Sequence, residues 1–270
     1  MKTPRRAHHA VCALALLAVA RAAAPADRIP ITTSSEEARQ LYLEGRDLVE
    51  KLRATDARAL FQQAAAKDPG FALAQVGLAN SAGTAKEFFD AVARAVSLAD
   101  KASEPEKLLV CALDAGAKGE PSRQKDCLTR LVAACPDDER AHNQMGAYHF
   151  GRQEYAEAIA ESQQWGALTG NKLEATVALA QCQAAAGNRE LAMNLIEHVD
   201  PDGMPGGILH RGIALVYASL GERDQAFTWL AKAEERRAKS LCNIKIDPKL
   251  DGLREDPRFG ELLRRVGLEK

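Results

Sequence analysis

A repeat of 33 or 34 residues constrains this chain more than any other feature of its sequence. Small or short residues recur at this interval, and a second series seven residues later keeps the same steps. Repetition at periods of about 20 to 50 residues is typical of solenoids, propellers and other arrays. The first series is Ala57, Ala91, Gln124, Ala158, Ala192 and Ala226, and the second is Ala64, Leu98, Leu131, Trp165, Val199 and Ala233.

Each period has room for two helices. Apolar residues follow a helical spacing within a unit, as in Ala57, Phe61 and Ala64. Turns are predicted at Gly151, Gly187 and Gly221, because glycine readily takes the left-handed conformation that ends a helix. The composition agrees, since 46% of the residues are apolar but only 5% are aromatic, which favours small side chains between packed helices.

The repeat resembles the tetratricopeptide repeat, whose units carry Trp-x2-Leu-Gly-x2-Tyr followed by Ala-x3-Phe-x2-Ala and Pro. Three stretches, 41–46, 102–107 and 256–259, further resemble the arrays found in bacterial regulatory and sensor proteins. No sensor, kinase, cyclase or winged-helix module accompanies the repeats in these 270 residues, so the resemblance implies a scaffold without a signalling activity. In the first unit the matching residues are Leu41, Gly45, Leu48, Ala57, Phe61, Ala64 and Pro69.

The resemblance implies an all-α, right-handed solenoid of helical hairpins that ends in a capping helix. We expect about six units over residues 36–238, a capping segment over 239–270 and a linker over 23–35. Asp256 can cap the last helix, with Pro257 at its first position. At the other end, Ser34 or Ser35 can cap the first helix.

The first residues are typical of an export signal. A positive start is followed by an apolar run over residues 10–20 and by small residues, which predicts a signal over 1–22 with cleavage between 22 and 26. An uncleaved anchor is the weaker alternative, because 11 apolar residues are about half of what spanning a bilayer requires. The protein is therefore expected to be exported, and periplasmic or secreted in a bacterium.

The charge gives no support for nucleic acid or an anionic membrane as the main partner. The whole chain carries a formal net charge of −1. Removal of the predicted signal, which holds Lys2, Arg5, Arg6 and Arg21 and no acidic residue, leaves −5. A mildly acidic protein lacks the basic surface that such polyanions attract.

Five cysteines follow the predicted signal, and an odd number leaves at least one unpaired. No Cys-x-x-Cys occurs, which excludes a zinc knuckle or a dithiol motif of that spacing. We interpret them mainly as small buried residues. The one disulfide candidate joins Cys111 to Cys127 or to Cys135, because all three fall in one helical pair. The remaining two are Cys182 and Cys242.

No catalytic, cofactor-binding or metal-binding residues are predicted, and no cofactor is expected. The sequence contains no Walker motif, no Gly-x-Ser-x-Gly and no His-Glu-x-x-His. His142 and His149 would share a helix face, but two turns separate them by about 10 Å, too far for one metal ion. We expect both to pack in the core or the groove. The glycine-rich stretch 203–207 is interpreted as a turn between units.

In the family that the repeat resembles, the first helix of each unit lines a concave groove that binds peptides. The resemblance therefore implies a non-catalytic scaffold of the cell envelope that binds a protein or peptide. Alternatives are a structural subunit of an envelope assembly, using the convex surface or the array ends, and an enzyme. The candidate partner-binding residues are Arg39, Tyr42, Arg46, Asn80, Arg140, Asn143, Gln181 and Arg211.

Overall fold

The computed structural model describes residues 28–50, 54–170, 172–203 and 207–268. The predicted signal and residues 204–206 of the predicted glycine-rich turn lie outside the described residues. Across the described part, the regular elements are helices. They are α1 (Glu36–Glu50), α2 (Ala54–Lys67), α3 (Ala72–Asn80), α4 (Ala85–Leu98), η1 (Ala99–Lys101), α5 (Glu104–Lys118), α6 (Pro121–Ala134), α7 (Glu139–Gly151), α8 (Tyr155–Thr169), α9 (Leu173–Ala185), α10 (Arg189–Glu197), α11 (Ile208–Ser219), α12 (Arg223–Glu235), η3 (Lys239–Asn243), η4 (Pro248–Leu253) and α13 (Pro257–Arg265).

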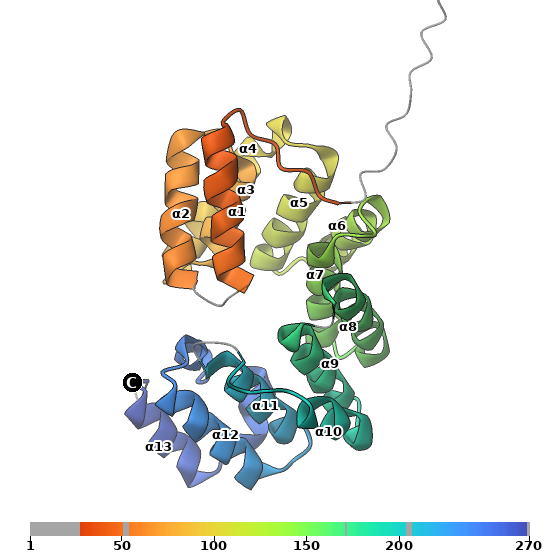
Figure 1. Cartoon of the computed structure of the whole chain (residues 1–270), viewed down its shortest axis with the longest axis vertical. Helices are drawn as coiled ribbons and strands as arrows, with labels where there is room; N and C mark the ends of the chain where they lie inside the picture. The colour runs from red at the N-terminus through yellow and green to blue at the C-terminus, as the bar shows by residue number, and fades with distance from the viewer. Residues whose placement is uncertain (1–27, 51–53, 171, 204–206, 269–270) are drawn as a thin grey trace, which may run out of the picture.

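The helices form six antiparallel hairpins, from α1 with α2 to α11 with α12. Each hairpin also contacts the next one, mainly through α2 with α3, α4 with α5, α6 with α7, α8 with α9, and α9 with α11. The stacked hairpins curve, so that the first and last units lie at the two ends of an arch (Figure 1). The prediction of an all-α solenoid of helical hairpins is confirmed.

The small residues of the repeat lie where the two helices of a hairpin touch. The side chains of Ala57, Ala158 and Ala226 are fully buried, because any larger group would separate the helices. Gln124 departs from the pattern. It is half-buried, and its amide nitrogen lies 2.8 Å from the place where a Cβ on Gly116 would be, so the missing side chain on α5 makes room for the long one on α6.

Phe61 holds the first two units together. A Cβ added to Gly45 would lie 2.6 Å from Phe61 Cε1, and one added to Gly77 would lie 2.7 Å from Phe61 Cδ1. Both distances are shorter than any tolerable contact between carbon atoms. Helices α1 and α3 can therefore lie this close to the ring only because each has a glycine, which lacks a Cβ, at the contact. The ring of Tyr42 packs beside it, with 5.7 Å between the centroids.

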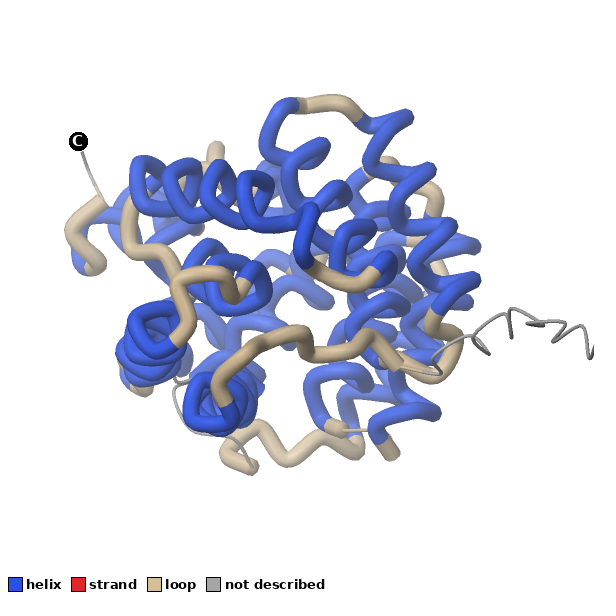
Figure 2. Tube along the Cα trace, turned by 90° about the horizontal axis from the view of Figure 1, so that it is seen from above, coloured by secondary structure: helices blue, strands red, loops and turns tan. Residues whose placement is uncertain are grey.

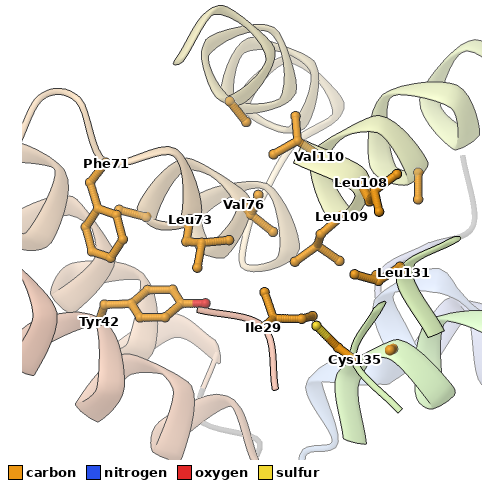
Figure 3. Packing of buried hydrophobic residues seen from close by; sticks show 14 of the residues in the cluster. Ile29, Tyr42, Phe71, Leu73, Val76, Leu108, Leu109, Val110, Leu131 and Cys135 are labelled. Atoms are coloured by element: carbon orange, nitrogen blue, oxygen red, sulfur yellow. The ribbon is translucent and has the colours of Figure 1, made fainter. Parts of the chain in front are cut away.

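The described part of the predicted linker, residues 28–35, is an extended segment that we call the strap. It runs from the start of α1 toward α7 and is the red segment in Figure 1 and a long stretch of loop in Figure 2. Its residue Ile29 is buried in the cluster that continues through Val76, Leu109 and Leu131 to Met145 (Figure 3). The strap is thus bound to the array that follows it.

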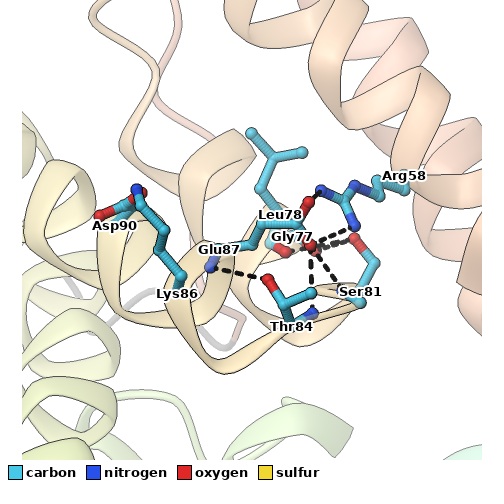
Figure 4. A network of polar contacts seen from close by, with 9 residues as sticks. Arg58, Gly77, Leu78, Ser81, Thr84, Lys86, Glu87 and Asp90 are labelled. Atoms are coloured by element: carbon cyan, nitrogen blue, oxygen red, sulfur yellow. Dashed lines mark hydrogen bonds and ion pairs between the residues drawn. The ribbon is translucent and has the colours of Figure 1, made fainter.

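A polar network joins the first and second units on the α2 and α4 side (Figure 4). Arg58 Nη1 donates to Glu87 Oε2 at 2.8 Å. The same carboxylate accepts the backbone N–H groups of Gly83 and Thr84, and the Thr84 hydroxyl caps α4. The hydrogen bond from Arg58 lowers the pKa of Glu87 to about 2.

The cap follows the last hairpin as expected. Asp256 accepts a hydrogen bond from the Arg258 backbone N–H, and Pro257 begins α13. At the front, Ser35 caps the first helix, since its hydroxyl oxygen accepts from the Ala38 N–H at 3.1 Å, whereas Ser34 bonds to Asp68. This resolves the alternative that the sequence left open.

Cys111 and Cys127 form a disulfide between α5 and α6, and Cys135 is a free buried thiol. Of the two proposed pairings, the structure contains the first. The interpretation of the cysteines as small buried residues holds for Cys135 and Cys182 but is wrong for Cys242, which is exposed beside the surface residue Asn243 in η3. No helix in the described ranges is long and apolar enough to cross a membrane.

Candidate functional site

A cavity of about 680 Å³ opens on the inner side of the arch, and we call it the concave cavity. The first helices of five units, α1, α3, α5, α7 and α9, all contribute to its lining, together with the end of α8. The lining residues are Arg28, Tyr42, Arg46, Val49, Phe61, Val76, Gly77, Asn80, Leu109, Leu113, Glu139, Arg140, Asn143, Gln144, Trp165, Leu168, Thr169, Lys172 and Glu174.

The apolar part of the concave cavity comes from the core of the first units and from α8. Val76 and Leu109 are buried residues whose outer surfaces line the cavity. Trp165 and Leu168, in the last turns of α8, are half-buried and also line the cavity. An apolar side chain of a bound segment would therefore meet hydrophobic surface there.

The rim of the concave cavity is charged, with four basic and two acidic side chains in the lining. Arg46 Nη2 lies 3.0 Å from Glu139 Oε1, which joins α1 to α7 across the cavity. Each of the two side chains keeps about a fifth of its surface exposed, so a ligand can reach both. The remaining charged lining residues are Arg28, Arg140, Lys172 and Glu174.

Arg140 is held rigidly at the rim. Its guanidinium donates two hydrogen bonds to Asp138, at 2.8 and 2.6 Å, and one to the Ile29 carbonyl oxygen at 3.0 Å. Burial opposes the charge of Arg140, but the bonds to Asp138 outweigh it and raise the arginine pKa. Burial also raises the pKa of Tyr42, although Arg140 and Arg46 nearby act in the opposite direction.

The two histidines expected to pack in the core or groove are buried on α7. His142 Nδ1 lies 2.6 Å from Glu161, and His149 Nδ1 lies 2.6 Å from Glu154. The imidazoles thus contact different carboxylates. Within the described ranges, no three His, Cys, Asp or Glu residues are grouped so that they could hold a metal ion.

No protein-family model and no curated protein matches the chain. Among solved structures, the chain is similar to the Cut9–Hcn1 hetero-tetramer of APC/C, with a TM-score of 0.51 and 19% identity over 85% of this chain. The match covers 46% of that protein, so this chain spans about half its length. The six stacked hairpins, which recur every 33 or 34 residues, and the likeness to this solved structure indicate the same fold. The chain has the tetratricopeptide-repeat fold.

Two further structures resemble the chain. One is a tetratricopeptide repeat protein from Parabacteroides merdae, at 17% identity and a TM-score of 0.47, covering 86% of this chain and all of the other. The second is PilW, described as a type IV pilus biogenesis factor, at 15% identity and a TM-score of 0.47, covering 82% and 99%.

The tetratricopeptide-repeat fold brings five of the eight candidate partner-binding residues to the concave cavity. These five are Tyr42, Arg46, Asn80, Arg140 and Asn143. Asn80 and Asn143 are exposed there, whereas the Tyr42 side chain is almost completely buried and offers only its edge.

The other three candidates lie outside the cavity lining. Arg39 forms an ion pair with Glu36 on the same helix, at 3.4 Å. Gln181 Nε2 donates to the Gly212 carbonyl oxygen at 3.4 Å, and Arg211 forms an ion pair with Asp247. The last two residues contact the cap and α11, because η4 packs back against α11 at the end of the array.

Trp165 lines the cavity but is not among the candidate partner-binding residues. In the sequence it stands where the repeat usually has a compact residue, which leaves open how closely the helices of the fourth hairpin approach. The preceding and following positions in this series, Leu131 and Val199, are indeed buried. Trp165 is too large for that space and stays half-buried at the cavity wall, so a bulky residue at a small-residue position was the available signal.

Proposed function

We propose that this chain is an exported scaffold that binds a protein or peptide in the concave cavity and carries out no catalysis. The observation that carries the proposal is the cavity itself, which five repeat units build together. Its volume of about 680 Å³ lies within the range typical of ligand sites. It suits one or two side chains of an extended segment better than a whole folded surface.

The chemistry of the lining favours a particular kind of segment. An apolar side chain can pack against Trp165, Leu168 and Leu109, which all line the cavity. The lining holds four basic and two acidic side chains, and this excess of positive charge favours a carboxylate on the bound segment. The proposed partner is therefore an extended peptide segment with an apolar residue next to an acidic one.

Two observations support export. The sequence predicts a signal over residues 1–22, and the mature part contains the Cys111–Cys127 disulfide. Disulfides persist in oxidising compartments such as the periplasm and are rare in the cytosol. Mass spectrometry of the mature N-terminus tests this part, and recovery of soluble protein that still begins at Met1 would contradict it.

Site-specific photo-crosslinking in the native envelope tests the binding site. A photoreactive amino acid replaces Asn143, which is exposed in the cavity, and in a matched control it replaces Gln163, which is exposed on α8 outside the lining. We expect one peptide segment to be captured at 143 and not at 163. Capture of the same segment at both positions would contradict binding in the cavity.

The captured segment is then synthesised and its affinity measured by calorimetry. Trp165→Ala should weaken binding at least ten-fold, because it removes one apolar wall of the cavity, and Arg46→Ala should weaken it several-fold. Leu191→Ala is the control, since Leu191 is exposed on α10 away from the cavity. Unchanged affinity in a folded Trp165→Ala variant would overturn the proposed site.

A further inference from the structure

The strap is held on the array by contacts of the kind that bind an extended peptide. The Ile29 side chain is only 3% exposed and lies near Leu109, Leu131 and Cys135 (Figure 3). Its backbone is also fixed, because Ile29 N–H donates to Asp138 Oδ2 at 2.8 Å and its carbonyl oxygen accepts from Arg140. One residue thus fills an apolar socket while its main chain is bound on both sides.

The same pattern continues toward α1 on two more carboxylates. The backbone N–H of Thr32 donates to Glu106 Oε1 at 2.8 Å, and its hydroxyl donates to Oε2 at 2.5 Å. The hydroxyl of Thr33 donates to Asp68 Oδ2 at 2.6 Å, and the Ser34 N–H donates to the same oxygen at 2.8 Å. Each carboxylate therefore accepts both a main-chain N–H and a hydroxyl group.

These carboxylates lie near the start of the first helix in three successive units, at positions that are not equivalent in the repeat. Asp68 lies just before α3, Glu106 lies in the first turn of α5, and Asp138 caps α7. Their exposed fractions are 9%, 0% and 1%. Each carboxylate is also bonded by its own unit, Glu106 by Ser103, Asp68 by Gly70 and Asp138 by Arg140. The strap therefore uses acceptor capacity that the array itself leaves over, and it presents N–H and hydroxyl groups along its length to do so.

The strap can leave this row without disturbing the repeats. Ile29 is the only strap residue whose side chain is buried, and the other residues from 28 to 35 are exposed or half-buried. The hairpins also contact one another directly, so each interface between units has contacts that do not involve the strap.

We propose that Asp68, Glu106, Asp138 and the apolar socket of Ile29 form a second peptide-binding site, the strap site, and that residues 29–34 occupy it in the absence of a partner. The site takes an extended partner segment that contains a branched aliphatic residue, in the place of Ile29. Three positions after that residue, consecutive Ser or Thr residues begin, in the places of Thr32, Thr33 and Ser34. An acidic or phosphorylated residue at the hydroxyl positions is rejected, because it would face a buried carboxylate. The strap site is separate from the concave cavity, and this inference does not depend on the function proposed for that cavity.

A titration with the strap peptide tests the proposal. The probe is the fluorescein-labelled peptide Arg-Ile-Pro-Ile-Thr-Thr-Ser-Ser, which repeats residues 28–35. The full chain with Ile29→Ser and Thr32→Val has a weakened strap and an unchanged site. It should bind the peptide at least ten-fold more tightly than the wild-type chain does, because the wild-type strap competes at a high effective concentration.

Three controls define the result. Leu191→Ser on the exposed face of α10 should bind the peptide as weakly as the wild type. Trp165→Ala introduced into the weakened-strap chain should leave peptide affinity unchanged, since Trp165 lines the other site. A peptide with Glu in place of the first Thr should bind at least ten-fold more weakly. Equal binding of the Glu peptide, or no binding to a weakened-strap chain that circular dichroism shows to be folded, would overturn the proposal.

Hydrogen exchange on the wild-type chain gives a second test that needs no variant. If the strap can be displaced, the backbone N–H groups of Ile29, Thr32 and Ser34 exchange at least ten-fold faster than those in the middle of α1. Excess strap peptide should not slow the exchange of α1. Equal protection of the strap and α1 would show that the strap opens only when the array unfolds, and the proposal would fail.

Discussion

Replacing Gly77 with alanine tests the packing of Phe61 against two helices. The added Cβ would lie 2.7 Å from Phe61 Cδ1 and Cγ, roughly 1 Å closer than the favourable separation of carbon atoms. The ring cannot move toward α1, because Gly45 allows an approach that leaves only 2.6 Å between its own missing Cβ and Phe61 Cε1. The strain must therefore spread into the backbone of α3.

Two effects of opposite sign decide the magnitude. Overpacking a filled core typically costs about 1–3 kcal/mol, whereas alanine in place of glycine stabilises a helix interior by about 1 kcal/mol. The expected net effect of Gly77→Ala is a loss of about 1 kcal/mol in the free energy of unfolding, which lowers Tm by roughly 2–4 °C for a chain of this size. Thermal unfolding followed by circular dichroism measures the shift.

Gly260 supplies the matched control, because it lies in α13 with no atom within 4 Å of an added Cβ. Gly260→Ala gains helix propensity without a clash, so its Tm should rise. In a Phe61→Leu background, Gly77→Ala should lose most of its penalty, since the ring that it meets has been removed. A rise in Tm for Gly77→Ala equal to that for Gly260→Ala would refute this account of the packing.

Three further predictions concern charge and the disulfide. Burial opposes ionisation of Asp138, but its hydrogen bonds, chiefly from the Arg140 guanidinium, keep its pKa below the usual 3.8. The ionised carboxylate therefore contributes stability that is present above about pH 4 and is lost as the pH falls through the folded pKa. In Asp138→Asn, the midpoint of urea unfolding should accordingly change less between pH 5 and pH 2 than it does in the wild type. The hydrogen bond with Glu161 raises the pKa of His142 above 6.5. The protonated imidazole therefore contributes stability that is present below pH 6.5 and is lost as the pH rises through the folded pKa. Glu161→Gln should abolish this pH-dependent loss of stability, and a stability–pH profile identical to that of the wild type would contradict the prediction. Reduction of Cys111–Cys127, whose cysteines are 16 residues apart, should lower the free energy of unfolding by about 2–4 kcal/mol, and an unchanged Tm after complete reduction would count against the bond.

The repeat architecture could be predicted from the sequence because its signal is local and recurs. Each small residue such as Ala158 or Ala226 sits at a helix contact, and the same contact returns one period later. The concave groove was implied by the resemblance to the repeat family, in which the first helix of each unit lines it. Tyr42, Arg46 and Arg140 were candidates for that reason, and all three line the concave cavity.

The contacts that the strap and the C-terminal cap make with the array could not be predicted in this way. Residues 28–35 have no periodicity, and their partners Asp68, Glu106 and Asp138 are spread over 70 residues of sequence. The cap does not follow the repeat, and its Asp247 forms an ion pair with Arg211. The repeat pattern alone places Arg211 in an open groove. In both cases the decisive contacts join segments that no periodic rule relates.

The strap also alters how an array of this kind is expected to come apart. In a solenoid whose units touch only their neighbours, each unit unfolds with its own stability and that of its two interfaces. Here the hydrogen bond from Ile29 to Asp138 links positions 109 residues apart. One buried cluster runs from Ile29 to Met145 beside a smaller one on α3 and α4, and the later units and the cap have clusters of their own. With the strap in place, the front units should therefore unfold more cooperatively than contacts between neighbouring units alone allow, and displacement of the strap should remove this additional coupling.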